Sequence, residues 1–341
     1  MLTIKIERNV PGLVNMFYNG KFHTSTQASY EKVSYETSAP NWTSNENSSY
    51  MSRLVKKGAS VLAVAGSFDH IIDMALYGAR NIYAVDVNPL QLPIDWLKYQ
   101  AVINLTPGGF SKFALSTKGN LLLSREVMEN ILSKSDSCLE KEFWETVYRE
   151  KDPLDIRLNY LLSERNYIYN HSERIVMFDY PDQTKFSKAR NALKESFIYA
   201  EEKDIFDVML PGCSIDLIHL SNLHNFFFPE DYVKKVQELS KFLKEDGCIV
   251  LYCIGMKKEW FDAIKEGAEG IPMFASDLNL AYFARNPLLM QATEQQIVHT
   301  MLLYDELLKH FNVEVIPVKT GRGFAGYNTP TDIVLSVSLK K

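Results

Sequence analysis

The sequence predicts an α/β protein with a seven-stranded, doubly wound and mostly parallel sheet that ends in an antiparallel hairpin and carries a helical insertion. Two observations support this fold class. Short apolar runs typical of strands alternate with amphipathic stretches typical of helices, as in parallel sheets with helical crossovers. The last two runs, 313–318 and 333–339, are rich in β-branched residues and have no helix between them, which predicts an antiparallel pair. The glycine-rich segment 321–331 would join them.

Five further strands are expected earlier in the chain, each a short apolar run. They are Val61–Ala65, Ile82–Val85, Phe197–Ala200, Ile215–Leu220 and Cys248–Ile254. A helix is expected from Pro89, with Asn88 as its N-cap, and another from Pro229 to Leu243. Residues 104–110, NLTPGGF, are interpreted as a linker because a proline and two glycines interrupt the helical pattern.

Two segments do not belong to the predicted sheet. Residues 1–50 are polar, and we expect an N-terminal arm, either a surface segment or a flap over the cofactor that presents Tyr30, Tyr35 and Trp42. Residues from about 111 to 195 are helical by period and far exceed an ordinary connection, so they predict a helical insertion. The α/β domain is therefore expected to span residues 51–341.

Composition excludes several classes of function. The formal net charge of −5 over 341 residues shows no excess of basic residues of the kind that nucleic-acid-binding proteins have. The chain has no apolar run long enough for a membrane span and no signal-peptide core, so we expect a cytoplasmic protein. The four cysteines lack metal-binding spacing, and no metal site is predicted. The sequence does not determine the oligomeric state.

The clearest functional motif lies in residues 61–86. A buried strand is followed by the turn Gly66-Ser67-Phe68-Asp69, a helix, a second strand and a terminal acid, Asp86. A glycine turn and an acid about 20 residues later are typical of nucleotide-binding βαβ units. A dinucleotide site would have glycines where this chain has Phe68 and Ile71. Their absence, with the terminal hairpin, favours S-adenosyl-L-methionine and the Rossmann-like fold of class I transferases.

The candidate cofactor-binding residues follow the carboxyl ends of the predicted strands. Asp86 should accept hydrogen bonds from both ribose hydroxyls, because the alternative role of helix cap suits Asn88 better. Gly66 and Ser67 would let the backbone approach the methionine end of the cofactor. The full set is Ala65, Gly66, Ser67, Asp69, Asp86, Val87, Asn88, Gln91, Asp204, Ile205, Ser221 and Asn222.

Several of these residues keep two interpretations. Asp69 either holds the amino group of the cofactor or caps the helix that follows it. Asn88 and Gln91 either contact adenosine or support the loop. Ser221 and Asn222 either face the cofactor and the acceptor or cap a helix.

The adenine contact and the catalytic groups are predicted from their positions after strands. Asp204 would accept a hydrogen bond from the adenine amine, and Glu202 is the competing acid for this contact. Ile205 would pack on the adenine ring. His224 is the candidate base among the histidines, and Tyr327 is a candidate for the acceptor pocket.

The motifs of this chain resemble those of the DUF3419 family, whose best-known members are betaine-lipid synthases of the BtaA type. The resemblance covers residues 58–105 and 197–260. It depends on the turn Ala65–His70, the run Ala84–Leu92 (AVDVNPLQL) and the block Leu220–Asn222. It implies transfer of the 3-amino-3-carboxypropyl group of S-adenosyl-L-methionine to a lipid such as diacylglycerol, with methylthioadenosine leaving.

The leading hypothesis is therefore an aminocarboxypropyl transferase acting on a lipid or small-molecule acceptor. A small-molecule methyltransferase that uses the same cofactor is the first alternative, and a cofactor-binding protein without turnover is the second. A lipid acceptor would bring the protein into peripheral contact with a membrane.

Overall fold

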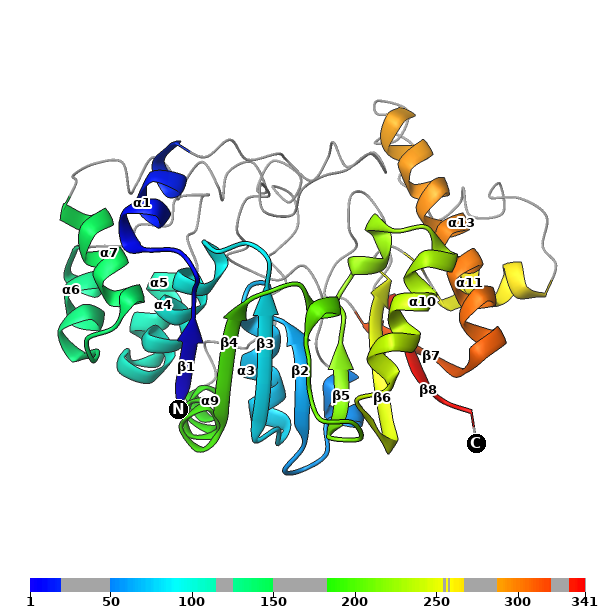
Figure 1. Ribbon diagram of the computed structural model, residues 1–341, viewed down its shortest axis with the longest axis horizontal. Helices are drawn as coiled ribbons and strands as arrows, with labels where there is room; N and C mark the ends of the chain where they lie inside the picture. The colour runs from blue at the N-terminus through cyan, green and yellow to red at the C-terminus, as the bar shows by residue number, and fades with distance from the viewer. Residues whose placement is uncertain are drawn as a thin grey trace. The chain divides into compact units, whose positions relative to one another are not determined.

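The computed structural model describes two compact units of the chain. The residues described are 1–19, 50–114, 125–149, 183–253, 256, 258–266, 287–319 and 331–340. The first unit contains the described residues up to Val208 except 50–55, and the second contains 50–55 and those from Met209 onward. Within these residues each unit has four strands and its own helices (Figure 1).

The first unit is built on four parallel strands. They are β1 (Leu2–Lys5), β2 (Ser60–Val64), β3 (Asn81–Asp86) and β4 (Phe197–Glu202), in the order β1-β4-β3-β2. Val61, Leu62 and Ala63 of β2 are all fully buried, as expected for a parallel strand that is covered on both faces. Because the strands are parallel and in register, the carboxyl ends of β2, β3 and β4 meet at one edge.

Strand β1 corrects the predicted number of strands from seven to eight. Its four residues, LTIK, alternate between half-buried and exposed side chains, and so short a run gives no clear strand pattern. The strand forms by pairing with β4, from Leu2 opposite Ile198 to Lys5 opposite Glu201. Figure 1 shows β1 in dark blue as the outer strand beside β4.

Helix α1 (Val10–Asn19) follows β1 and packs against α7 (Leu139–Arg149). Leu13 and Phe17 of α1 are fully buried, so the start of the predicted polar arm contributes to a core. Residues 20–49, with Tyr30, Tyr35 and Trp42, lie outside the described residues.

The remaining elements of the first unit include the described part of the predicted helical insertion. They are α3 (Asp69–Tyr77), α4 (Gln91–Asn104), α5 (Pro107–Ala114), α6 (Arg125–Lys134), α9 (Gln183–Glu195) and the short 3-10 helix η4 (Ile205–Asp207). The insertion packs on α4, and the indole N–H of Trp144 donates to the Pro93 carbonyl at 2.8 Å. The predicted linker at 104–110 is wrong, because Pro107 begins α5. The Gly109 N–H donates to Thr106 Oγ1 at 3.1 Å, so a side-chain cap and a suitable first residue start this helix.

The second unit combines a parallel pair of strands with an antiparallel hairpin. Its elements are α2 (Met51–Leu54), β5 (Ile215–His219), the 3-10 helix η5 (Leu223–Phe226), α10 (Pro229–Ser240), β6 (Leu243–Cys253), α11 (Lys258–Lys265), α13 (Pro287–His310), β7 (Phe311–Lys319) and β8 (Thr331–Leu339). Strand β6 begins at Leu243, five residues before the predicted Cys248. Strands β5 and β6 are parallel, and β8 pairs antiparallel with both β6 and β7.

The predicted fold class is therefore correct in its main features, which are an α/β architecture, mostly parallel strands and a terminal antiparallel hairpin. No helix in the described parts of the chain combines the length and the apolar content that crossing a membrane would require.

Candidate functional site

The candidate site is the edge of the first unit where β2, β3 and β4 end. Gly66 follows β2, Asp86 ends β3 and Glu202 ends β4. Asp86 and Glu202 are opposite each other in the register, and the Lys203 N–H donates to the Asp86 carbonyl at 2.9 Å. In open parallel sheets, ligands bind beyond the carboxyl ends of the strands, so this edge is where a cofactor is expected.

The glycine turn leaves space next to its backbone. Gly66 has a φ of 51°, in the left-handed region, and a Cβ built at this position would have no neighbour within 4 Å among the described residues. Phe68 also has a left-handed φ, 66°, which a bulky side chain adopts only when its surroundings fix it. The Phe68 ring is fully buried and lies edge-on to Tyr99 at 6.3 Å. The turn is therefore anchored by Phe68 and open at Gly66.

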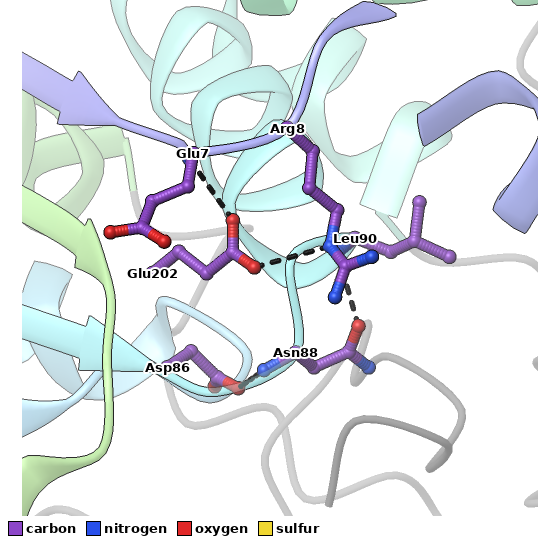
Figure 2. A network of polar contacts seen from close by, with 6 residues as sticks. All are labelled: Glu7, Arg8, Asp86, Asn88, Leu90 and Glu202. Carbon is purple, nitrogen blue, oxygen red and sulfur yellow. Dashed lines mark hydrogen bonds and ion pairs between the residues drawn. The ribbon is translucent and has the colours of Figure 1, made fainter. Parts of the chain in front are cut away.

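Asp86 ties this turn to the loop that follows β3. Its carboxylate accepts the Gly66 N–H at 3.1 Å and the Asn88 N–H at 2.9 Å. Figure 2 shows the contact with Asn88. A carboxylate has about four acceptor positions, so two remain for hydroxyl groups of a ligand. Burial raises the pKa of Asp86 to about 6, although the two backbone donors act in the opposite direction.

A buried lysine fixes the other end of the turn. Lys98 of α4 donates from Nζ to the Ser67 carbonyl at 2.7 Å and to Asp69 Oδ1 at 2.9 Å. Asp69 Oδ2 accepts from Ser67 Oγ at 3.1 Å, and both partners of the ion pair are almost completely buried. Of the two interpretations of Asp69, the helix cap is wrong, because Phe68 is the N-cap of α3 and Asp69 is the first helical residue, whereas contact with the cofactor stays a prediction. Lys98 was not predicted, since a lysine in a helix carries no sequence signal of a partner 29 residues away in the chain.

The loop after β3 is stabilised by a hydrogen bond from its own backbone to the Asn88 side chain. Asn88 Oδ1 accepts the Leu90 N–H at 3.0 Å, and α4 begins at Gln91 with Leu90 as its N-cap. The prediction that Asn88 caps a helix starting at Pro89 is therefore wrong by two residues. The Asn88 side chain instead stabilises a local turn, a common role for asparagine before a helix.

Another buried carboxyl group, that of Asp95, lies one turn into α4. Gln91 Nε2 donates to Asp95 Oδ1 at 2.7 Å, and Asp95 has no exposed surface. Burial raises the pKa of Asp95 well above its ordinary value, and the hydrogen bond from Gln91 opposes that rise. This contact lies within α4, so both interpretations of Gln91, contact with adenosine and support of the loop, stay predictions.

The end of β4 presents the two acids that compete for the adenine contact. Asp204 Oδ1 accepts the Phe206 N–H at 3.0 Å, so Asp204 caps η4, and Ile205 behind it is buried. Glu202 instead accepts the Glu7 N–H at 3.1 Å and the Arg8 Nε–H at 3.2 Å (Figure 2). The residues of the β1–α1 connection were not predicted as part of the site.

In the second unit, Ser221 and Asn222 follow β5 as predicted. Ser221 has a left-handed φ of 54°, and its carbonyl accepts the Tyr252 N–H at 2.9 Å. Asn222 occupies the N-cap position of η5, but its side chain makes no capping hydrogen bond. Cofactor contact by these two residues remains a prediction.

His224 is placed differently from what a catalytic base requires. The side chain is completely buried, and neither ring nitrogen has a hydrogen-bond partner among the described residues. Its ring stacks on His299 with centroids 5.9 Å apart, while His299 Nε2 donates to the His224 carbonyl at 2.9 Å. Burial, and then His299, lowers the pKa of His224 to about 3. Such an imidazole is a weak proton acceptor, so His224 is poorly suited to act as a catalytic base. Tyr327 lies outside the described residues.

The pKa of Asp86 predicts how ligand binding should depend on pH. If ribose hydroxyls donate to the ionised carboxylate, affinity for S-adenosyl-L-methionine should fall as the pH drops below about 6. The α-amino and α-carboxyl groups of the ligand ordinarily titrate outside pH 5 to 7. Asp95 interacts electrostatically with Asp86, so it is the other carboxyl group whose titration must be separated from that of Asp86. Titration calorimetry between pH 5 and 7 measures the effect. The Asp86→Asn variant should lose this dependence, and an unchanged profile in that variant would assign it to another group.

Comparisons with known proteins gave low similarity. No protein-family model and no curated protein matches this sequence. Among solved structures, the chain is similar to an S-adenosylmethionine-dependent methyltransferase from Aquifex aeolicus, at 12% identity and a TM-score of 0.32, covering 84% of this chain and 85% of that one. A ribosomal protein L11 methylase from Lactobacillus delbrueckii subsp. bulgaricus gives 13% identity and a TM-score of 0.32, and the match covers 85% of this chain and 75% of that one. A candidate S-adenosyl-L-methionine-dependent methyltransferase from Methanococcus maripaludis gives 12% identity and a TM-score of 0.36, and the match covers 85% of this chain and 83% of that one. TM-scores this low support no conclusion about activity.

Proposed function

We propose that this protein is an S-adenosyl-L-methionine-dependent transferase that moves the 3-amino-3-carboxypropyl group to a lipid or small-molecule acceptor. The observation that carries the cofactor assignment is the position of Asp86 at the end of β3, hydrogen-bonded to the N–H of Gly66 at 3.1 Å. A single carboxylate thereby joins the glycine turn to the position where a ribose is expected.

The residues at this edge fit a nucleoside better than a dinucleotide. The space at Gly66 accepts the close approach of a ligand, and Asp86 retains acceptor positions for a ribose diol. A pyrophosphate cradle would need small residues farther along the turn, where Phe68 and Ile71 are both fully buried. These features favour S-adenosyl-L-methionine over a nicotinamide dinucleotide.

The chemistry follows from what the chain can hold in place. When bound, S-adenosyl-L-methionine supplies a sulfonium whose three neighbouring carbons are open to attack by a nucleophile. Asp86 would hold the ribose, and the turn stiffened by Lys98 would hold the backbone next to the amino-acid arm. The contribution of these residues is orientation, which aligns the chosen carbon with the acceptor.

The choice of carbon depends on the resemblance to betaine-lipid synthases. The run from Ala84 to Leu92 and the block from Leu220 to Asn222 carry that resemblance, and it implies transfer from the γ-carbon. Methyl transfer to a small molecule is the alternative that the same cofactor allows.

The released product tests this proposal. Incubation of the protein with S-adenosyl-L-methionine and diacylglycerol micelles should release methylthioadenosine, measured by chromatography and mass spectrometry. The Asp86→Asn variant should release much less, because the cofactor binds more weakly. Release of S-adenosylhomocysteine would contradict aminocarboxypropyl transfer and support a methyltransferase. Tight binding of the cofactor without either product, across lipid and small-molecule extracts, would support a non-catalytic protein.

A further inference from the structure

Three polar residues of α4 form one buried face next to the glycine turn. Gln91, Asp95 and Lys98 are four and three residues apart, so they lie on the same side of the helix, and at most 1% of each is exposed. Lys98 donates to the Ser67 carbonyl and to Asp69, so this face of α4 lies against the turn. Asp95 precedes Lys98 by about one helical turn and therefore lies near the glycine turn as well.

The charges beside the turn do not balance. Lys98 and Asp69 form a buried ion pair at 2.9 Å and offset each other. Asp86 and Asp95 remain, and the donors to their carboxyl groups among the described residues are two backbone N–H groups and the Gln91 amide, all uncharged. Ionisation of both acids would therefore leave an excess of negative charge that the described residues do not compensate.

One oxygen of Asp95 also has no partner. Oδ1 accepts from Gln91 Nε2 at 2.7 Å, whereas Oδ2 is buried and has no hydrogen-bond partner among the described residues. A buried carboxylate in this state is destabilising unless a bound positive charge compensates it.

The turn has room for such a positive charge. A Cβ built at Gly66, whose N–H donates to Asp86, would meet nothing within 4 Å among the described residues. The described part of the chain contains no group of three or more His, Cys, Asp or Glu side chains placed to hold a metal ion. An organic cation is therefore the better match for this pair of acids.

We propose that Asp95 makes the site selective for a nucleoside that carries a positive charge, by placing a second buried carboxylate near Asp86. The inference rests on the function proposed above, because it takes an adenosyl cofactor as the ligand. S-adenosyl-L-methionine has a positive sulfonium, whereas methylthioadenosine and S-adenosylhomocysteine contain a neutral thioether. Asp95 would favour binding of the substrate and release of the product through its charge, without touching the reacting carbon.

The charge state of Asp95 is coupled to the ligand. Burial raises the pKa of Asp95, and Asp86 and Asp69 raise it further, so the protonated acid is favoured in the empty site. The Gln91 amide and Lys98 act in the opposite direction. A cation bound at the turn would add to this opposing effect, so cation binding and ionisation of Asp95 should reinforce each other.

The test compares three ligands by titration calorimetry: S-adenosyl-L-methionine, S-adenosylhomocysteine and sinefungin, in which an amine supplies the positive charge in place of the sulfonium. Asp95→Asn nearly keeps the shape of the side chain, and its amide oxygen still accepts the Gln91 hydrogen bond. This variant should bind the two cationic ligands about tenfold more weakly and S-adenosylhomocysteine with little change. The measured quantity is the preference for the cationic ligands within each protein.

Two further variants complete the experiment. Asp136→Asn removes an exposed acid from the connection between α6 and α7, and this matched control should keep the preference of the parent. Gln91→Met removes the donor that favours the ionised form of Asp95, so it should lower the preference by a smaller factor. This variant tests the inference independently if Asp95→Asn does not fold.

The outcomes separate this inference from the proposed function. An unchanged preference in Asp95→Asn and Gln91→Met, with full binding by the parent, would overturn the role of Asp95 and leave the cofactor site intact. Equal losses for all three ligands would assign Asp95 a purely structural role and would also overturn the inference. Binding of none of the ligands by the parent would overturn the proposed function and this inference with it.

Discussion

Replacing Asp86 with alanine should weaken the binding of S-adenosyl-L-methionine by about 10²- to 10⁴-fold. Hydrogen bonds to a charged group are worth about 1.5–3 kcal/mol each, and the proposed site loses two of them. Asp86→Asn should lose less, because the amide oxygen still accepts one hydrogen bond. Titration calorimetry measures both constants.

The Asp86 variants need a control for indirect effects, since the same carboxylate accepts the N–H groups of Gly66 and Asn88. Glu195→Gln removes a solvent-exposed acid that pairs with Arg80, just before the amino end of β4. This control should bind the cofactor like the parent. Equal binding by Asp86→Ala and the parent, with both proteins folded, would exclude Asp86 from the ligand site.

Replacing Lys98 with methionine should destabilise the fold by about 3–5 kcal/mol, because the change leaves Asp69 as an uncompensated buried charge. The Ser67 carbonyl also loses its donor, so the cofactor turn should loosen and binding should weaken. Denaturant unfolding followed by circular dichroism measures the free energy.

The double variant Lys98→Met/Asp69→Asn should recover part of the lost stability, since no buried charge then remains unpaired. Lys234 pairs with Asp231 on the exposed surface of α10, and Lys234→Met should leave unfolding unchanged. A small loss in Lys98→Met, similar to that of Lys234→Met, would contradict the structural role of the buried pair.

The sequence predicts the parts of the site that are encoded locally. Gly66 and Asp86 lie in one βαβ unit, where the order of strand, turn, helix and strand brings them together, and the structure joins them by a hydrogen bond. The short apolar runs that alternate with helical segments likewise locate β2 to β8, because a buried strand consists mainly of apolar residues.

Other features depend on partners far away in the chain. Arg8 and Glu202 are separated by 194 positions, and β1 becomes a strand only because β4 offers a free edge. His224 is a further example, because its local sequence does not reveal the packing against His299, 75 positions away, that accompanies its burial. Such contacts arise from the fold, and no local pattern encodes them.

The most direct test of the central claim is a crystal structure of the protein with S-adenosyl-L-methionine bound. We expect the ribose hydroxyls within hydrogen-bond distance of Asp86, the amino-acid arm against the turn at Gly66 and the adenine at the end of β4. Ligand density at another place on the protein, or a ribose turned away from Asp86, would contradict the site proposed at the ends of β2, β3 and β4.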